Sequence, residues 1–305
     1  MASLTTLPRY SDGLSFIYLE RAVLEREAQS VTAIMSEGRV SLPAANMACL
    51  LLGPGTRITH SAVGALADAG CCIIWCGEGA LKFYASGRAK AGHSKNLELQ
   101  ARQWADPELH MKVVRRMYGI RFGEVLSNKL SLQQIRGREG ARVREAYRLS
   151  AEKFGIEWNG RNYSRDNWQS SDPVNRALSS ANAALYSICL AGVISSGFSP
   201  GLGFIHQGKP LSFIYDIADL YKLDLSIPAA FAAASNGSDK IERAARSGIR
   251  DGAYKLQLLD RIVGDLKRLY GSEEVSFEQI PLPTAELWDP SGNIRGGVSY
   301  GNPRS

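Results

Sequence analysis

The chain has 305 residues, of which 45% are hydrophobic and 22% charged, and this composition excludes a disordered or fibrous protein. Its length is sufficient for two domains, and no run of about eighteen apolar residues predicts a membrane span. The amino terminus lacks a charged stretch followed by an apolar one, so we expect a cytoplasmic protein with no membrane partner.

Residues 1–84 are predicted to form a small β-rich domain. Short apolar runs punctuated by glycine and proline are typical of strands. Such runs cover residues 14–19, 31–35, 47–52 and 71–75. One helix is expected at residues 62–69, because residues 59–61 can cap its start and Gly70 can end it.

Residues 85–95 are predicted to be a linker, because they are rich in glycine and lysine and show no periodicity. From residue 96 to residue 271 apolar residues recur at helical spacing, which predicts a larger, all-helical domain. The expected helices cover residues 97–104, 107–122, 132–154, 173–196, 210–224, 228–234 and 240–270. We therefore expect an α+β fold in which a β-rich domain precedes a helical one.

Residues 272–305 are predicted to be an extended tail, because the apolar periodicity ends after Gly271. Residues 279–288 are interrupted by prolines but carry possible apolar anchors at Ile280, Leu282, Leu287 and Trp288. One interpretation is a disordered terminus, and the other is a strand that binds a partner protein.

Positive charge is concentrated in residues 82–150, which hold fifteen lysine or arginine residues against six acidic ones, a local charge of +9. The rest of the chain is acidic on balance, at −3. Such a concentration favours a polyanionic partner, because neutralising phosphates releases counterions and supplies affinity that does not depend on sequence. A basic, solvated face without a partner is the alternative interpretation.

The segment 203–219 reads GFIHQGKPLSFIYDIAD and has the pattern of a metal site. Pro210 suits the first position of a helix, and apolar residues after it recur at helical spacing. Asp216 and Asp219 then lie at the rim of the apolar face, and His206 in the preceding turn can fold back towards Asp216. Imidazole and carboxylate ligands suit Mn²⁺, Mg²⁺ or Zn²⁺, although no sulfur favours zinc. A solvated pair of acids with a capping histidine is the alternative.

A further carboxylate, Glu139, lies on the apolar stripe of the helix expected at residues 132–154. A carboxylate that faces the core is costly unless it is paired or bound to a metal. Gly137 and Gly140 beside it leave room for a bulky group. A candidate metal ligand within a basic region is the combination that phosphodiester chemistry needs. A buried pair between Glu139 and an arginine is the alternative interpretation.

Together these motifs resemble the CRISPR-associated integrase of the spacer-adaptation complex, and most closely its type I-E subfamily. The resemblance rests on the segments RGREG at 136–140, GFIHQGKPLSF at 203–213 and YDIAD at 215–219. The segments LGPGTR at 52–57 and YASG at 84–87 are similar to the same subfamily. The motifs follow the family's order over nearly the whole chain, and their combination is specific.

The resemblance implies a β-rich domain that dimerises and a helical catalytic domain. It also implies a divalent metal, Mg²⁺ or Mn²⁺, held by Glu139, His206 and Asp219, with Asp216 beside it as a further essential acid. Two dimers of the family combine with a dimer of a small ferredoxin-like adaptation protein into a heterohexamer. In this subfamily the carboxy-terminal tail contacts that small partner.

The resemblance further implies contacts with double-stranded DNA, both the captured protospacer and the CRISPR repeat. The candidate DNA-binding residues are Arg57, Lys82, Arg136, Arg138, Tyr186 and Lys209. Lys82 stands where the family often has arginine, so the charge is kept and a bidentate phosphate contact is put in doubt. Tyr186 resembles a tyrosine near the family's active site, and a packing role fits its helix equally well.

The expected reaction is metal-dependent transesterification, in which the 3′-hydroxyl of a short DNA duplex attacks a phosphodiester of the repeat. One bond is exchanged for another of similar energy, and the sequence contains no phosphate-binding loop motif for ATP. His206 is expected to be a metal ligand, with a general-base role also chemically open. Two other functions stay open: a hydrolytic, structure-specific DNA endonuclease with the same metal, and a DNA-binding scaffold without chemistry.

Overall fold

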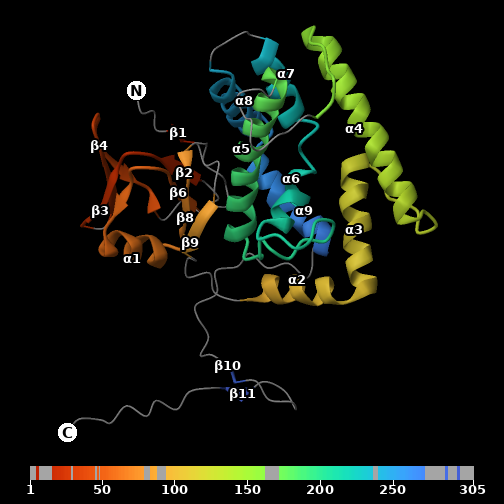
Figure 1. The fold of residues 1–305 in the computed structure, drawn as a ribbon. Helices are drawn as coiled ribbons and strands as arrows, with labels where there is room; N and C mark the ends of the chain where they lie inside the picture. The colour runs from red at the N-terminus through yellow and green to blue at the C-terminus, as the bar shows by residue number, and fades with distance from the viewer. Residues whose placement is uncertain are drawn as a thin grey trace.

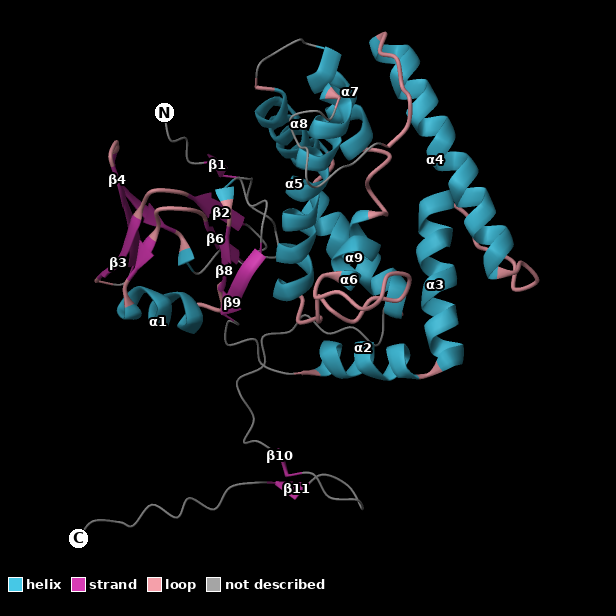
Figure 2. Ribbon diagram, in the orientation of Figure 1, coloured by secondary structure: helices cyan, strands magenta, loops and turns pink. Residues whose placement is uncertain are grey.

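The structure is a computed structural model. It describes residues 5–6, 16–28, 30–44, 47, 49–78, 83–87, 94–161, 172–235, 240–271, 286–287 and 294–295. Most strands lie in the first part of the chain and most helices in the second, and the strand-rich part lies beside the helical part (Figures 1 and 2). This order confirms the expected α+β fold.

The strand-rich part contains two sheets. The first has the strand order β1 (Thr5–Thr6), β2 (Phe16–Leu19), β6 (Cys49–Leu52), β8 (Cys72–Cys76) and β9 (Phe83–Gly87). Its three central strands are parallel to one another, and its edge strands are antiparallel to their neighbours. The second has the order β5 (Gly38–Leu42), β4 (Ser30–Met35), β3 (Val23–Glu27) and β7 (Arg57–Ile58). Helix α1 (His60–Asp68) packs on β3 and β4 of the second sheet and on β8 of the first.

The first sheet is covered on both faces, which explains why its central strands are continuous apolar runs. In β6, Leu50 and Leu52 pack with the second sheet and α1, whereas Cys49 and Leu51 belong to the helical core. Alternate residues of a strand point to opposite faces, so β6 contributes to both cores. The four predicted strands correspond to β2, β4, β6 and β8.

Several strands were not predicted from the sequence. Strand β3 reads VLERE and β5 reads GRVSL, so neither contains a long apolar run, because each is buried on one side only. The two-residue strands β1 and β7 are too short to show a pattern. Strand β9 pairs with β8 as far as Gly87 and therefore crosses the expected border between residues 84 and 85.

The helical part is built around one buried helix, α5 (Pro173–Ser195), which contacts α6, α7, α8 and α9. It is long and apolar enough to cross a membrane, but most of it is buried inside the protein, as expected of a core helix. The other helices are α2 (Lys95–Ala105), α3 (Pro107–Phe122), α4 (Leu132–Phe154), α6 (Ser212–Ala218), α7 (Ser226–Ser235), α8 (Ile241–Lys255) and α9 (Leu258–Tyr270). In the tail, β10 (Glu286–Leu287) pairs with β11 (Ile294–Arg295).

The helix expected at residues 210–224 is shorter than predicted. Helix α6 ends at Ala218, because the N–H groups of Leu220 and Tyr221 donate to carbonyls only three residues back. Bonds of this kind tighten the chain into turns, and the apolar periodicity continues through them. The prediction of one long helix here was therefore wrong.

The helix expected at residues 240–270 is two helices, α8 and α9. They are separated at Gln257, whose φ of +47° is a left-handed conformation that interrupts a right-handed helix. No proline or glycine marks this break in the sequence, so the periodic pattern alone gave no sign of it.

Candidate metal centre

Asp216 of α6 anchors the turn that carries His206. Its side chain is completely buried, and its oxygens accept hydrogen bonds from the backbone N–H groups of Phe204, Ile205 and His206 at 2.6, 3.0 and 2.9 Å. One oxygen also lies 2.7 Å from Nδ1 of His206. The imidazole folds back onto Asp216 as expected. The expected place of Asp216 at the rim of the apolar face is wrong, because these bonds are made inside the protein.

This hydrogen bond determines which ring nitrogen of His206 is available to a ligand. When a carboxylate accepts the proton of Nδ1–H, the lone pair of the neutral imidazole is on Nε2, which is then the nitrogen available to a metal or a proton. The side chain of His206 is 44% exposed, so a ligand can approach it. Asp216 already has four donors around its two oxygens, which makes it a positioning residue for this turn.

A polar cavity of about 300 Å³ is lined by α3, α4, α5, the turns after α6, the start of α7 and Arg161, which follows α4. Its polar lining consists of Arg121, Glu139, Tyr147, Arg161, Asn182, Tyr186, Asp219 and Lys222. Of the three candidate metal ligands, Glu139 and Asp219 line this cavity and His206 does not.

One buried guanidinium joins the two carboxylates. Arg121, with a side chain only 3% exposed, has Nη1 at 3.4 Å from Oε1 of Glu139 and Nη2 at 3.2 Å from Oδ2 of Asp219. The other oxygen of Asp219 lies 2.6 Å from Nζ of Lys222, and Arg142 approaches Oε2 of Glu139 to 4.0 Å. The structure therefore contains the alternative that the sequence predicted for Glu139, which is a buried pair with an arginine. The arginine that makes this pair, Arg121, lies on α3 and not on the helix of Glu139.

Charges in this cavity keep Asp219 ionised. Burial raises the pKa of Asp219, but Lys222 and Arg121 outweigh burial and hold that pKa below its ordinary value. Burial likewise lowers the pKa of Lys222, and attraction by Asp219 reverses this and raises it above its ordinary value. His206 makes a smaller contribution to the lowered pKa of Asp219, so the imidazole is within range of a charge interaction. An ionised carboxylate is the form that binds a metal.

Among the described residues, no group of three or more histidine, cysteine or acidic side chains is close enough to hold a metal ion. Arg121 bridges Glu139 and Asp219, and His206 is bonded to Asp216. The predicted set of three ligands is thus not assembled around one point in this structure.

The donor atoms nevertheless fit a divalent cation. Within the described part of the chain, two oxygens that can bind a cation, Oε2 of Glu139 and Oδ1 of Asn182, are buried at this cavity without a hydrogen-bond partner. A buried unsatisfied group costs about 1–3 kcal/mol and calls for an explanation such as an ion or a ligand. Carboxylate oxygens with one imidazole nitrogen are ligands that Mg²⁺ or Mn²⁺ accepts.

The candidate DNA-binding residues that the structure describes lie on several elements. Tyr186 lines the polar cavity, where Nζ of Lys222 lies 5.0 Å from its ring centroid. Lys209 is exposed on the turn before α6, and Arg57 is exposed on β7 in the second sheet. Lys82 lies outside the described residues.

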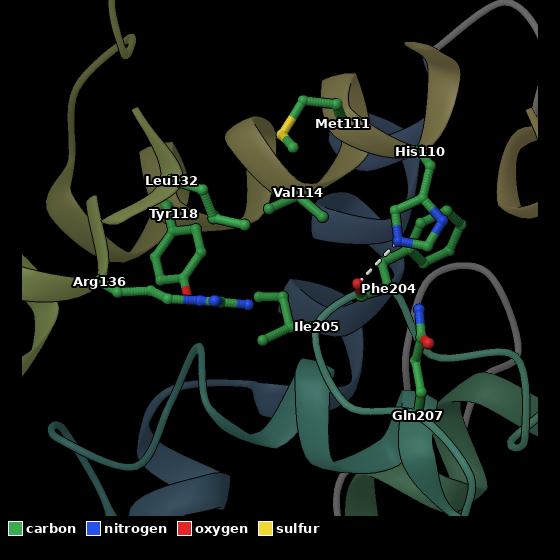
Figure 3. A pocket seen from close by; sticks show the side chains of 9 residues that line it. All are labelled: His110, Met111, Val114, Tyr118, Leu132, Arg136, Phe204, Ile205 and Gln207. Atoms are coloured by element: carbon green, nitrogen blue, oxygen red, sulfur yellow. Dashed lines mark hydrogen bonds between the residues drawn. The ribbon is translucent and has the colours of Figure 1, made fainter. Parts of the chain in front are cut away.

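Arg136 and Arg138 both lie on α4 but have different surroundings. Arg138 pairs with Glu124 at 2.5 Å, and its guanidinium carbon lies 4.9 Å from the ring centroid of Phe122. Arg136 lines a second cavity of about 300 Å³, beside the turn at residues 204–207 (Figure 3). Arg138 is therefore already paired on the surface, whereas Arg136 faces a cavity.

His110 of α3 connects this second cavity to the turn. Its Nε2 lies 2.8 Å from the carbonyl oxygen of Phe204 (Figure 3). Its Nδ1 lies 3.0 Å from the carbonyl oxygen of Trp104. Helix α3 thus holds the turn from one side while Asp216 holds it from the other.

Gly203, just before this turn, is predicted to tolerate no side chain. A Cβ there would overlap the carbonyl oxygen of His206 and lie 2.7 Å from the backbone carbon of Ser212. We expect Gly203→Ala to lower the free energy of unfolding by about 2–4 kcal/mol, as measured by urea denaturation.

The matched control is Gly264→Ala in α9, where a Cβ would meet nothing within 4 Å. Alanine there is expected to raise the free energy of unfolding by about 0.5–1 kcal/mol. Similar changes in the two variants would contradict the packing described for Gly203.

Comparison with known proteins decides the family. The "CRISPR-associated endonuclease Cas1 2" of Thermus thermophilus is 47% identical to the chain over 304 residues, covering 98% of the chain and 94% of that protein. The chain belongs to the Cas1 family. A family model described as "CRISPR associated protein Cas1" matches residues 121–243, and this range contains every residue that lines the polar cavity.

Solved Cas1 structures have the same architecture. The structure described as "Crystal structure of TtCas1-DNA complex" is 47% identical, has a TM-score of 0.76, and covers 87% of this chain and 99% of that one. A Cas1 protein from Thermotoga maritima is only 15% identical but has a TM-score of 0.61, covering 83% of this chain and 96% of that one. The Cas1 fold is therefore kept when most of the sequence differs.

Three charged residues of the Cas1 cavity, Arg121, Arg161 and Lys222, were not predicted from the sequence. Arg121 follows the buried residues Val114 and Met117 on one face of α3, so an arginine on an apolar face was the available signal. Lys222 lies three residues after Asp219, a spacing typical of helical ion pairs. Because arginine and lysine are not metal ligands, a sequence pattern of metal ligands does not include either residue type.

Proposed function

We propose that the protein is a metal-dependent DNA integrase of CRISPR adaptation. It would join the 3′-hydroxyl ends of short protospacer duplexes to the CRISPR repeat by transesterification. The observation that carries this proposal is the gathering of Glu139 and Asp219, from separate elements, around one cation in a polar cavity. Similarity to a CRISPR-associated endonuclease and to a Cas1 crystallised with DNA supports a DNA substrate.

Glu139, Asp219 and His206 are proposed to hold Mg²⁺ or Mn²⁺. Glu139 offers the oxygen that lacks a hydrogen-bond partner, and His206 offers Nε2, the ring nitrogen that does not face Asp216. When bound, such an ion supplies Lewis-acid chemistry, which stabilises charge on phosphoryl oxygens and lowers the pKa of an attacking hydroxyl.

Other residues are proposed to bind and orient the DNA. Lys222 keeps its positive charge in the cavity, where Arg161 adds a second one, and both can attract a phosphodiester. Tyr186 borders the same space. Outside the cavity, DNA-backbone contacts are proposed for Arg57, Lys82, Arg136, Arg138 and Lys209.

A hydrolytic DNA endonuclease is the second candidate, because the Thermus relative is named an endonuclease. The same side chains serve either reaction, since water or a 3′-hydroxyl can attack the phosphodiester. A scaffold without chemistry would leave the buried acids of the cavity without a purpose.

The products separate these functions. A labelled short duplex is incubated with the full chain, Mg²⁺ or Mn²⁺, and a supercoiled plasmid that carries a CRISPR repeat. We expect the label to become joined to the plasmid. Shortened duplexes with free ends and no joined label would support hydrolysis, and unchanged DNA would support a scaffold.

We also propose that the protein acts in the cytoplasm as a homodimer of the type I-E kind, with a small ferredoxin-like adaptation protein in a heterohexamer. The tail at residues 272–305 is proposed to contact that partner. Truncation after Gly271 is therefore expected to abolish co-purification with the co-expressed partner while the dimer remains folded. Unchanged co-purification would contradict the role of the tail.

A further inference from the structure

We propose that Arg121 is an internal cation that takes the place of the divalent metal between Glu139 and Asp219 in the metal-free protein. Binding of the metal would then require the guanidinium to leave this position. The inference rests on the proposed function, because it takes both carboxylates to be metal ligands.

The position of Arg121 is that of a counter-ion. Glu139 comes from α4, Asp219 follows α6, and the guanidinium of α3 contacts one oxygen of each. Both acids are largely buried, with side chains 15% and 19% exposed. Two carboxylates in such surroundings raise each other's cost of ionisation unless a cation lies between them. Arg121 supplies that cation when no metal is bound.

The bonds that hold Arg121 are long. Hydrogen bonds between a guanidinium and a carboxylate are commonly about 2.7–2.9 Å and often bidentate. Arg121 makes one contact to each acid, at 3.2 and 3.4 Å, and its Nε has no partner among the described residues. Lys222, by contrast, lies 2.6 Å from Asp219. Of the two cations, Arg121 is therefore the one that a metal can displace at lower cost.

The formal charges favour the exchange. The four groups in direct contact, two carboxylates with Arg121 and Lys222, sum to zero, and Arg161 on the cavity wall adds one further positive charge. A divalent ion added to these four groups would leave an excess of two positive charges on largely buried side chains, which is costly. Movement of the guanidinium away from the carboxylates lowers the excess positive charge beside them, and a phosphodiester of bound DNA lowers it further.

Arg121 also has a partner other than the two carboxylates. The guanidinium borders about 300 Å³ of space, and its carbon already lies 5.1 Å from the ring centroid of Tyr118. A cation over a tyrosine ring keeps a favourable interaction after its carboxylates are lost. Departure therefore does not leave the charge buried alone.

The test is the affinity of the full chain for Mn²⁺, followed by the electron paramagnetic resonance signal of the free ion. We expect Arg121→Met, which keeps the length and removes the charge, to bind Mn²⁺ about tenfold more tightly or better than the unchanged chain. Arg142→Met is the matched control, because Arg142 is more exposed and only approaches Glu139 to 4.0 Å. Its affinity is expected to change by less than about twofold.

A second variant protects the test against loss of folding. Arg121→Lys keeps the charge, but its single ammonium cannot reach both acids as the fork of Arg121 does. Its affinity for Mn²⁺ is expected to lie between those of the unchanged chain and Arg121→Met. If Arg121→Met does not fold, Arg121→Lys alone decides the outcome.

The outcomes separate the inference from the proposed function. Equal Mn²⁺ affinities in the unchanged chain and the Arg121 variants would overturn the inference and leave the metal centre standing. Absence of Mn²⁺ binding in all of them would overturn both. Tighter binding that disappears when Asp219→Asn is added to Arg121→Met would support both.

Discussion

Replacing Glu139 with alanine is expected to lower the rate of strand transfer about 10³-fold while the protein stays folded. Glu139 is the proposed ligand whose Oε2 has no hydrogen-bond partner, and its loss removes half of the carboxylate pair. Alanine suits the middle of α4, and Arg121 keeps its contact with Asp219. The measurement is the initial rate at which a labelled duplex joins the repeat plasmid, with circular dichroism as the check on folding.

The matched control is Glu145→Ala on the same helix. Glu145 is exposed and pairs with Arg148 at 2.7 Å on the surface, so its removal changes the net charge equally without touching the cavity. We expect its strand-transfer rate to stay within about twofold of the unchanged chain. Full activity of Glu139→Ala, or an equal loss in both variants, would contradict the role given to Glu139.

Asp216→Asn is expected to lower the free energy of unfolding by about 3–4 kcal/mol and to abolish strand transfer. The carboxylate accepts from three backbone N–H groups and from Nδ1 of His206. An asparagine amide places N–H donors where some of these donors point, so the turn cannot keep all its bonds. Urea denaturation measures the first effect, and the plasmid assay measures the second.

Asp224→Asn provides the comparison, because it makes the same chemical change in a nearby turn. Asp224 is half exposed, and its nearest cation is Arg261 at 3.8 Å. Its effect on the free energy of unfolding is expected to be below about 0.5 kcal/mol. If Asp216→Asn proves as mild as Asp224→Asn, Asp216 does not anchor the turn that carries His206.

The fold could be predicted from the sequence where local signals coincide. Helices α3 and α4 begin and end at the predicted residues. Their C-terminal ends are marked by Gly123 and Gly155, which take left-handed φ values of 70° and 62° as C-caps. The central strand β6 was expected because it is buried on both faces. The break at Gln257 could not be predicted, since a residue of no special turn preference adopts a left-handed conformation there.

The same distinction holds for the site. His206 and Asp216 are ten residues apart, and the turn between them made their contact predictable. Arg121 and Asp219 are 98 residues apart, and only the packing of α3 against the helical core brings them together. A sequence motif indicates which side chains can bind a metal. Which cation contacts these side chains in the absence of a metal depends on contacts between segments that are distant in the sequence.

The position of Mn²⁺ in crystals of the full chain, located by its anomalous scattering, tests the metal centre most directly. We predict one site bonded to carboxylate oxygens of Glu139 and Asp219 and to Nε2 of His206, with the Arg121 guanidinium moved away from both acids. A site elsewhere in the protein, or no site between these residues at saturating Mn²⁺, would contradict the proposed metal centre.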